Sequence, residues 1–82
     1  MLLEILGSGC AKCQKLEDLT RQAVKEMDVD AQITHVKDIN VITGYGVMIT
    51  PALVKDGVVK VMGKIPSLDE IKKLISQGER HG

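Results

Sequence analysis

Aromatic side chains are almost absent from this chain. Tyr45 is the one aromatic residue, and there is no phenylalanine or tryptophan. Proteins that hold single-stranded nucleic acid stack its bases on aromatic rings, so this composition excludes such a platform. An excess of charge is lacking too, because 11 basic residues are balanced by 11 acidic ones. Net charge therefore gives no indication of a basic nucleic-acid-binding face, and we expect no nucleic-acid partner.

Long apolar runs are also missing. The apolar start, residues 1–6, is short and is interrupted by Glu4, whereas a signal peptide has a basic start and a longer apolar stretch. No run approaches the roughly 20 apolar residues of a membrane-spanning helix. We therefore expect a cytoplasmic protein with no membrane contact.

The length of 82 residues is enough for one compact domain. A domain of this size buries only about 60% of its unfolded surface, which leaves room for a single core. Apolar residues make up 44% of the chain and charged residues 27%, a balance typical of globular rather than disordered proteins. We expect one domain over residues 1–77, a polar tail over residues 78–82, and a monomer.

The hydrophobic pattern predicts an α/β domain with the element order β-α-β-α-β-β-α. The expected ranges are 2–6, 10 to about 27–30, 31–36, 39–45, 52–54, 58–62 and 68–77. Asp38 is the expected N-cap of the second helix. Asp56 and Gly57 form the strongest two-residue hairpin signal, and Ser67 with Glu70 forms a capping box before the last helix. The first two strands, separated by a long helix, should be parallel with a right-handed crossover.

The two cysteines, Cys10 and Cys13, are three positions apart. A bridge between them closes so short a loop that it stabilises the fold by only about 2 kcal/mol. Their position is more informative, because they stand where a strand gives way to a helix. The first turn of a helix has unsatisfied N–H groups and a partial positive charge, which stabilise a thiolate. This pattern in a cytoplasmic chain indicates redox chemistry.

The spacing assigns different roles to the two sulfurs. Cys10, at the entrance of the helix, is the expected nucleophile that attacks a substrate disulfide. Cys13, one turn further in and facing the core, is expected to attack the resulting mixed disulfide and release the reduced substrate. We therefore predict a disulfide oxidoreductase that requires no cofactor and no metal.

Three segments together resemble a known protein family. The initial strand runs into Gly-Ser-Gly-Cys-Ala-Lys-Cys, the sequence Ile-Thr-Pro-Ala occupies residues 49–52, and a Met-Gly step at residues 62–63 follows the hairpin. They resemble the small, glutaredoxin-sized, thioredoxin-like redox-active disulfide proteins of archaea and bacteria. The resemblance covers about residues 1–77. It implies a thioredoxin-like fold with a four-stranded mixed sheet and helices on both faces.

The resemblance also implies a substrate-binding segment. It implies a cis peptide bond before Pro51, with this proline against the active-site cysteines and the backbone of Thr50 pairing with the substrate. Gly63 and Lys12 complete the expected substrate contacts. The alternative for Pro51 is a proline that only opens a strand. Lys12 could also stabilise the Cys10 thiolate. The alternative interpretation of Lys12 is an ordinary exposed lysine without a role in the site.

Glu4 stands six residues before Cys10, and at this offset the resemblance implies a buried acid that moves protons to and from the second cysteine. A partly buried carboxylate could serve as the general base for Cys13. The alternative is a glutamate that faces solvent at the end of a strand. For Tyr45 we expect a core position rather than one beside the active-site groove.

The chain departs from the larger family in ways that concern its partners. Gly9 replaces the tryptophan that precedes the first cysteine of thioredoxins, and Ala11 and Lys12 form the inner pair, which leaves the redox potential open. The second glycine and acidic cap by which glutaredoxins hold glutathione are missing after Gly63. We therefore do not expect glutathione as the dedicated reductant. The expected substrates are protein or small-molecule disulfides, and the expected reductant is of the thioredoxin-reductase or dithiol type.

A metal carrier is the competing hypothesis. Soft thiolates in a C-x-x-C motif suit copper(I), and Cys10, Cys13, His35 and His81 are ligand types that zinc accepts. Copper chaperones with this motif have the order β-α-β-β-α-β, however, whereas this chain ends in a helix. The spacing of the four residues fits no compact zinc pattern, and we expect His35 to be a surface or packing residue.

Overall fold

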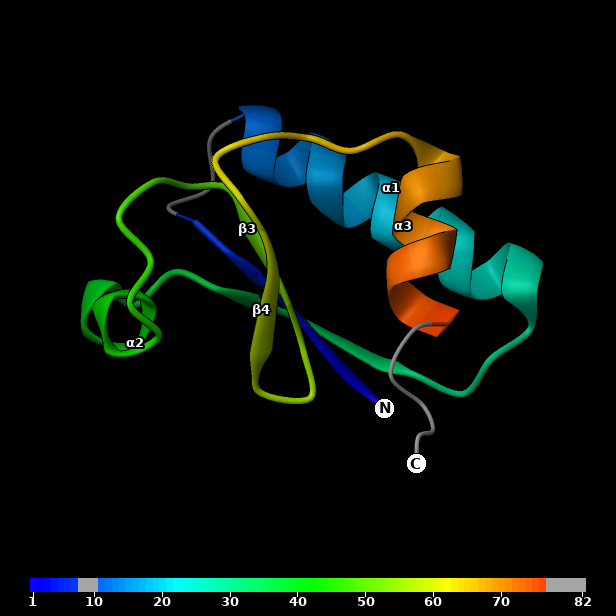
Figure 1. Ribbon diagram of the computed structural model, residues 1–82, viewed down its shortest axis with the longest axis horizontal. Helices are drawn as coiled ribbons and strands as arrows, with labels where there is room; N and C mark the ends of the chain where they lie inside the picture. The colour runs from blue at the N-terminus through cyan, green and yellow to red at the C-terminus, as the bar shows by residue number, and fades with distance from the viewer. Residues whose placement is uncertain (8–10, 77–82) are drawn as a thin grey trace.

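A four-stranded sheet with helices on both faces forms the domain (Figure 1). The computed structural model describes residues 1–7 and 11–76. The strands are β1 (Leu2–Leu6), β2 (Gln32–Val36), β3 (Ala52–Lys55) and β4 (Val58–Met62), and the helices are α1 (Ala11–Met27), α2 (Ile39–Gly44) and α3 (Leu68–Ser76). The element order and the fold class are those predicted from the sequence.

Strand β1 lies inside the sheet, which has the order β2-β1-β3-β4. It pairs in parallel with β2 and antiparallel with β3, while β3 and β4 form the predicted hairpin. Asp56 and Gly57 at its turn both have positive φ angles, of 48° and 86°, as a type I′ turn requires. The carboxylate of Asp56 also accepts a hydrogen bond from the N–H of Leu2, which joins the turn to the start of β1.

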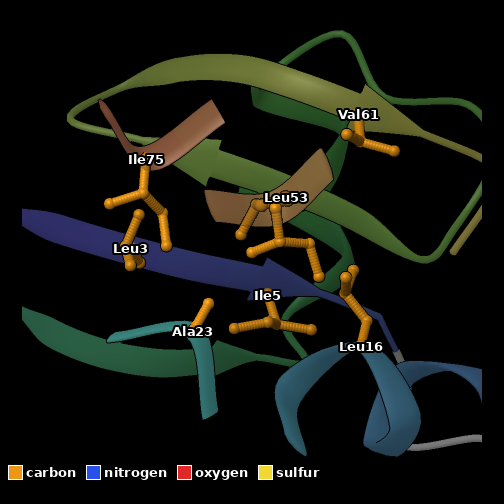
Figure 2. Close-up of a cluster of buried hydrophobic side chains, with 8 residues drawn as sticks. Leu3, Ile5, Leu16, Ala23, Leu53, Val61 and Ile75 are labelled. Carbon is orange, nitrogen blue, oxygen red and sulfur yellow. The ribbon is translucent and has the colours of Figure 1, made fainter. Parts of the chain in front are cut away.

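The larger core cluster lies between the sheet and the layer of α1 and α3. Alternate residues of a strand point to opposite faces, and Leu3 and Ile5 of β1 point to this one. Figure 2 shows Leu3 and Ile5 of β1 beside side chains of the helices, among them Leu16 and Ala23 of α1 and Ile75 of α3. The cluster comprises Leu3, Ile5, Leu16, Ala23, Leu53, Val61, Ile71 and Ile75. It holds the two longer helices against one face of the sheet.

A smaller cluster lies on the other face, under α2. Leu6 of β1 points to this face, and Tyr45 and Val59 pack at the edge of the smaller cluster. The buried residues of this cluster are Leu6, Ile42, Val47, Ala52 and Val54. Because β1 contributes to both clusters, its carboxyl end is fixed from both faces, and the cysteine motif follows it in the sequence.

The predicted helix caps are present. The Ser67 hydroxyl accepts from the Glu70 N–H at 3.2 Å, and the Glu70 carboxylate accepts from the Ser67 N–H at 3.0 Å, which completes the capping box. The carboxylate of Asp38 accepts from the N–H of Asn40 at the start of α2. Local side-chain chemistry thus starts both helices where the sequence predicted.

The structure corrects the predictions at element ends and at two buried polar side chains. Strand β3 includes Lys55, which is only 5% exposed. Its ammonium donates to the carbonyl of Ile75 at 2.6 Å, and a cation there complements the negative end of α3. In α1, Thr20 is fully buried, and its hydroxyl donates to the carbonyl of Leu16 at 2.7 Å. No helix of the described part is long and apolar enough to cross a bilayer.

Candidate functional site

Cys13 lies in the first turn of α1 and its side chain is fully buried. This agrees with the prediction that the second cysteine of the motif faces the core. Cys10 stands one residue before α1 in the sequence, but it lies outside the described residues, as do Ser8 and Gly9. The described part of the site consists of Cys13 and the residues around it.

The backbone of Gly7 packs directly against the sulfur of Cys13. A β-carbon added to Gly7 would overlap the Sγ atom of Cys13 and lie 3.2 Å from its β-carbon. The Gly7 N–H also donates to the carbonyl of Val36 at 2.9 Å, which fixes this position beside β2. Sequence reasoning treated Gly7 only as a residue that ends the strand. The feature of the sequence that could have indicated the role of Gly7 is a glycine at the end of the first strand, shortly before the cysteine motif.

The segment before β3 reaches the same point from the other side. The β-carbon of Thr50 lies 3.7 Å from the position that a β-carbon on Gly7 would occupy. The Thr50–Pro51 peptide bond is cis, as the resemblance implied. Thr50 is exposed and Pro51 is buried. Cys13, Gly7 and Thr50 therefore converge at the carboxyl end of β1.

Gly63 completes this group of residues. Its N–H donates to the carbonyl of Pro51 at 2.9 Å. Gly63 has a φ angle of 79°, and a β-carbon on it would lie 2.9 Å from a methyl carbon of Ile49. Both its conformation and the close approach of Ile49 favour glycine here. Gly63, Pro51 and Thr50 thus lie in one chain of contacts that reaches Gly7 and, through Gly7, Cys13. The functional roles predicted for these residues stay predictions.

Exposed apolar side chains surround this end of the molecule. Met48 is 88% exposed, Ile49 is 60% exposed and Met62 is 48% exposed. Ile49 packs on Gly63, and Met62 stands opposite Ala52 in the β3–β4 ladder. Apolar side chains are thus exposed next to Gly63.

Lys12 is exposed in the first turn of α1. It forms no hydrogen bond or ion pair with another residue of the described chain, so its predicted contact with substrate stays a prediction. Lys12 is next to Cys13 in the sequence, but this adjacency alone does not show that its side chain contacts Thr50, Pro51 or Gly63.

Glu4 occupies the sheet face under α2, opposite to α1. Its cross-strand neighbours are Thr34 and Val54. The hydroxyl of Tyr45, the C-cap residue of α2, donates to the Glu4 carboxylate at 2.5 Å. Glu4 is partly buried, so it is not the solvent-facing glutamate of the alternative interpretation. Cys13 approaches the sheet from the other side, with α1.

Tyr45 packs at the edge of the smaller core cluster, as expected, but its hydroxyl has a polar role that sequence reasoning missed. The hydrogen bond to Glu4, together with partial burial and the negative charge of Glu4, raises the pKa of Tyr45 above the ordinary phenol value of 10.0. The sequence signal was weak, because a tyrosine 41 residues away from a glutamate carries no local pattern.

The ligand set of the metal hypothesis is not assembled in residues 1–7 and 11–76. No three His, Cys, Asp or Glu side chains gather there in a way that could hold a metal ion. His35 contacts Glu17 of α1 through Nδ1 at 2.8 Å, which fits the packing role expected for it. Cys10 and His81 of the proposed set lie outside the described residues.

Comparison with known proteins finds one matching family and close relatives. The family model described as a thioredoxin domain matches residues 1–76. The thioredoxin of Methanothermobacter thermautotrophicus is 43% identical over 76 residues, covering 93% of this chain and 99% of the relative. The thioredoxin of Methanocaldococcus jannaschii is 40% identical over 73 residues, covering 89% of this chain and 84% of the relative.

The contact between Gly7 and Cys13 predicts that Gly7→Ala destabilises the fold. The added methyl must displace the Cys13 sulfur, and overpacking of this kind costs roughly 1–3 kcal/mol. We expect the free energy of unfolding in urea to fall by this amount. Gly44→Ala is the matched control, because a β-carbon at Gly44, the last residue of α2, has nothing within 4 Å. Equal stability of the two variants would contradict the proposed packing.

The hydrogen bond between Tyr45 and Glu4 predicts a change in tyrosine ionisation. In Glu4→Gln the neutral amide no longer repels a tyrosinate, so the pKa of Tyr45 should fall toward its ordinary value. Because Tyr45 is the one aromatic residue, ultraviolet absorbance against pH reports this group alone. Asp56→Asn, which removes a carboxylate from the hairpin turn, is the control and should leave the titration in place. An unchanged midpoint in Glu4→Gln would show that the two side chains do not interact.

Proposed function

Because the chain belongs to the thioredoxin domain family, we propose that it acts as a thiol–disulfide oxidoreductase through Cys10 and Cys13. The observation that carries this proposal is the place of the Cys13 sulfur. It is buried at the start of α1, against the Gly7 backbone and near Thr50. A second cysteine stands one residue before the helix, where a thiolate is stabilised.

The proposed reaction exchanges one disulfide for another. The Cys10 thiolate attacks one sulfur of the substrate disulfide and bonds to it, while the second substrate sulfur leaves as a thiolate and takes up a proton. Cys13 then loses its proton and attacks the Cys10 sulfur. The Cys10–Cys13 disulfide forms, and the first substrate sulfur is released and protonated. Two electrons have passed to the substrate, and an external dithiol returns them to the protein.

The segment around Pro51 is the proposed substrate contact. Thr50 is exposed and its β-carbon lies near Gly7, whose backbone packs on the Cys13 sulfur, so an extended substrate chain could pair with the backbone of Thr50 as an added strand. The hydrogen bond from Gly63 to Pro51 holds this segment in place. Lys12, exposed at the helix start, would contact the substrate from the other side.

Glu4 is the proposed proton acceptor for Cys13. The two side chains approach β1 from opposite faces, so we propose that the proton travels through water around the strand end rather than directly. Tyr45 would hold the carboxylate in place through its hydrogen bond. Among the described strand residues on this face, Glu4 is the one acid.

The partners that follow from this proposal are protein disulfides and a reductant of the thioredoxin-reductase or dithiol type. We propose that the protein works in the cytoplasm as a monomer. A pair of cysteines used for exchange rather than as a structural staple agrees with the cytoplasm.

Single serine variants test the two sulfur roles. We expect Cys13→Ser to accumulate a mixed disulfide with a peptide substrate, because nothing resolves it. Cys10→Ser should lose exchange altogether. Mass spectrometry of the protein after incubation with the oxidised peptide measures both outcomes. Retained disulfide reduction by Cys10→Ser would show that the roles are assigned wrongly.

The same preparations distinguish exchange from metal transport. If the purified wild-type protein holds zinc or copper in a one-to-one ratio and fails to reduce an insulin disulfide, the metal carrier hypothesis replaces this proposal. Elemental analysis with and without a chelator provides the measurement.

The role of Glu4 has a pH-dependent consequence. Glu4→Gln should slow decay of the mixed disulfide near neutral pH on the order of tenfold, which is less than the loss of a directly bonded general base. At alkaline pH the thiol of Cys13 ionises without help, so the difference should vanish. Rapid-mixing measurements of mixed-disulfide decay across pH test this. A pH-independent deficit would indicate a purely structural role for Glu4.

A further inference from the structure

A second surface feature lies beside the proposed substrate contact. A cavity of about 270 Å³ opens between β4 and α3, and β4 is an edge strand of the sheet (Figure 1). Its apolar lining consists of Val61, Pro66 and Leu74. None of its lining residues belongs to the predicted redox site, so the exchange chemistry leaves this cavity unused. We call it the β4–α3 groove.

The charged rim of the β4–α3 groove is predominantly basic. Lys60, Lys64 and Lys73 line it, against the single acid Glu70. The Glu70 carboxylate is already engaged in the capping box, and the hydrogen bond from the Ser67 backbone holds the pKa of Glu70 below its usual value. In a chain with no net charge, this rim is a local excess of positive charge.

The three lysines differ from Lys72 and Arg21, which form ion pairs. Lys72 pairs with Glu26 and Arg21 pairs with Glu17. Lys60, Lys64 and Lys73 form no ion pair within 4 Å in the described ranges 1–7 and 11–76. Their ammonium groups are therefore available to a ligand at the groove.

The groove adjoins the segment that would hold the substrate. Lys64 directly follows Gly63, which donates to Pro51 and packs on Ile49. Met62, half-exposed, precedes Gly63. A protein that presents a disulfide along Thr50 would extend over this step into the groove.

We propose that the β4–α3 groove docks an acidic segment of the protein whose disulfide is exchanged. An aliphatic side chain of that segment would occupy the apolar lining, and flanking carboxylates would meet the three lysines. Charge complementarity of this kind raises the association rate and makes it sensitive to ionic strength. The inference rests on the proposed function for its partner, but docking is measurable without the chemistry.

Two lysine-to-glutamine triple variants test the docking. One changes Lys60, Lys64 and Lys73 in the groove. The control changes Lys15, Lys25 and Lys37, which are exposed, and so removes the same charge elsewhere. The probes are two disulfide peptides of equal length, one flanked by Asp and Glu and one by Lys, together with a small neutral disulfide as the reference for chemistry.

We expect kcat/KM for the acidic peptide, relative to the small disulfide, to fall on the order of tenfold in the groove variant. The control variant should retain most of that ratio, and the lysine-flanked peptide should not lose rate in either. Raising the salt concentration should slow the acidic peptide with wild-type protein and affect the groove variant much less. An equal loss in both variants would show a net-charge effect and overturn the proposal.

A binding measurement separates this inference from the proposed function. The acidic peptide with its cysteines replaced by serine should bind the wild-type protein in calorimetry and bind the groove variant on the order of tenfold more weakly. This result would support docking even if the protein exchanged no disulfide. Equal binding to the wild-type protein and the groove variant would overturn the docking proposal, and so would a lack of binding to the wild-type protein. Displacement of the peptide by inorganic phosphate at low concentration would also overturn it, because it would show a site for small anions.

Discussion

The contact between the Gly7 backbone and the Cys13 sulfur is the constraint on which the rest of the site depends. It joins the end of β1 to the first turn of α1 without any intervening side chain. Because interiors are close-packed, the absence of one β-carbon sets how near the helix can approach the strand. The start of α1, with Cys13 in its first turn, is thereby placed near the carboxyl end of β1, which Thr50 also approaches.

Strand β1 makes this arrangement possible because it has neighbours on both sides and clusters on both faces. Leu3 and Ile5 anchor it to the α1–α3 layer, and Leu6 anchors it to the α2 layer. Glu4 is the exception among these aliphatic residues. Its burial beside α2 is offset by the Tyr45 hydroxyl, since a partly buried carboxylate needs a hydrogen-bond donor. A polar pair therefore persists in a face that is otherwise apolar.

Electrostatics divide the surface into regions with different uses. Charges on α1 and α3 largely compensate one another, as in the pairs of Glu17 with Arg21 and of Glu26 with Lys72. The end of the molecule around Met48 and Ile49 is apolar and exposed. The β4–α3 groove next to it is basic. An approaching partner thus meets an apolar surface and a positive one side by side, which together define an orientation.

The sequence by itself determined the element order, the hairpin turn at Asp56 and Gly57, the capping box at Ser67 and Glu70, and the cysteine pair at a helix start. These features depend on residues a few positions apart, whose interactions are local and leave a readable pattern. The cis bond before Pro51 came from family resemblance, because such bonds are too rare to infer from one proline. Only the tertiary structure decided that Gly7 touches Cys13, that Tyr45 reaches Glu4, that Lys55 caps α3, and that three lysines share one groove. Each of these contacts either joins positions far apart in the chain or depends on the face of a helix or strand from which a side chain points. The packing of the whole domain decides which positions meet and which face each side chain occupies.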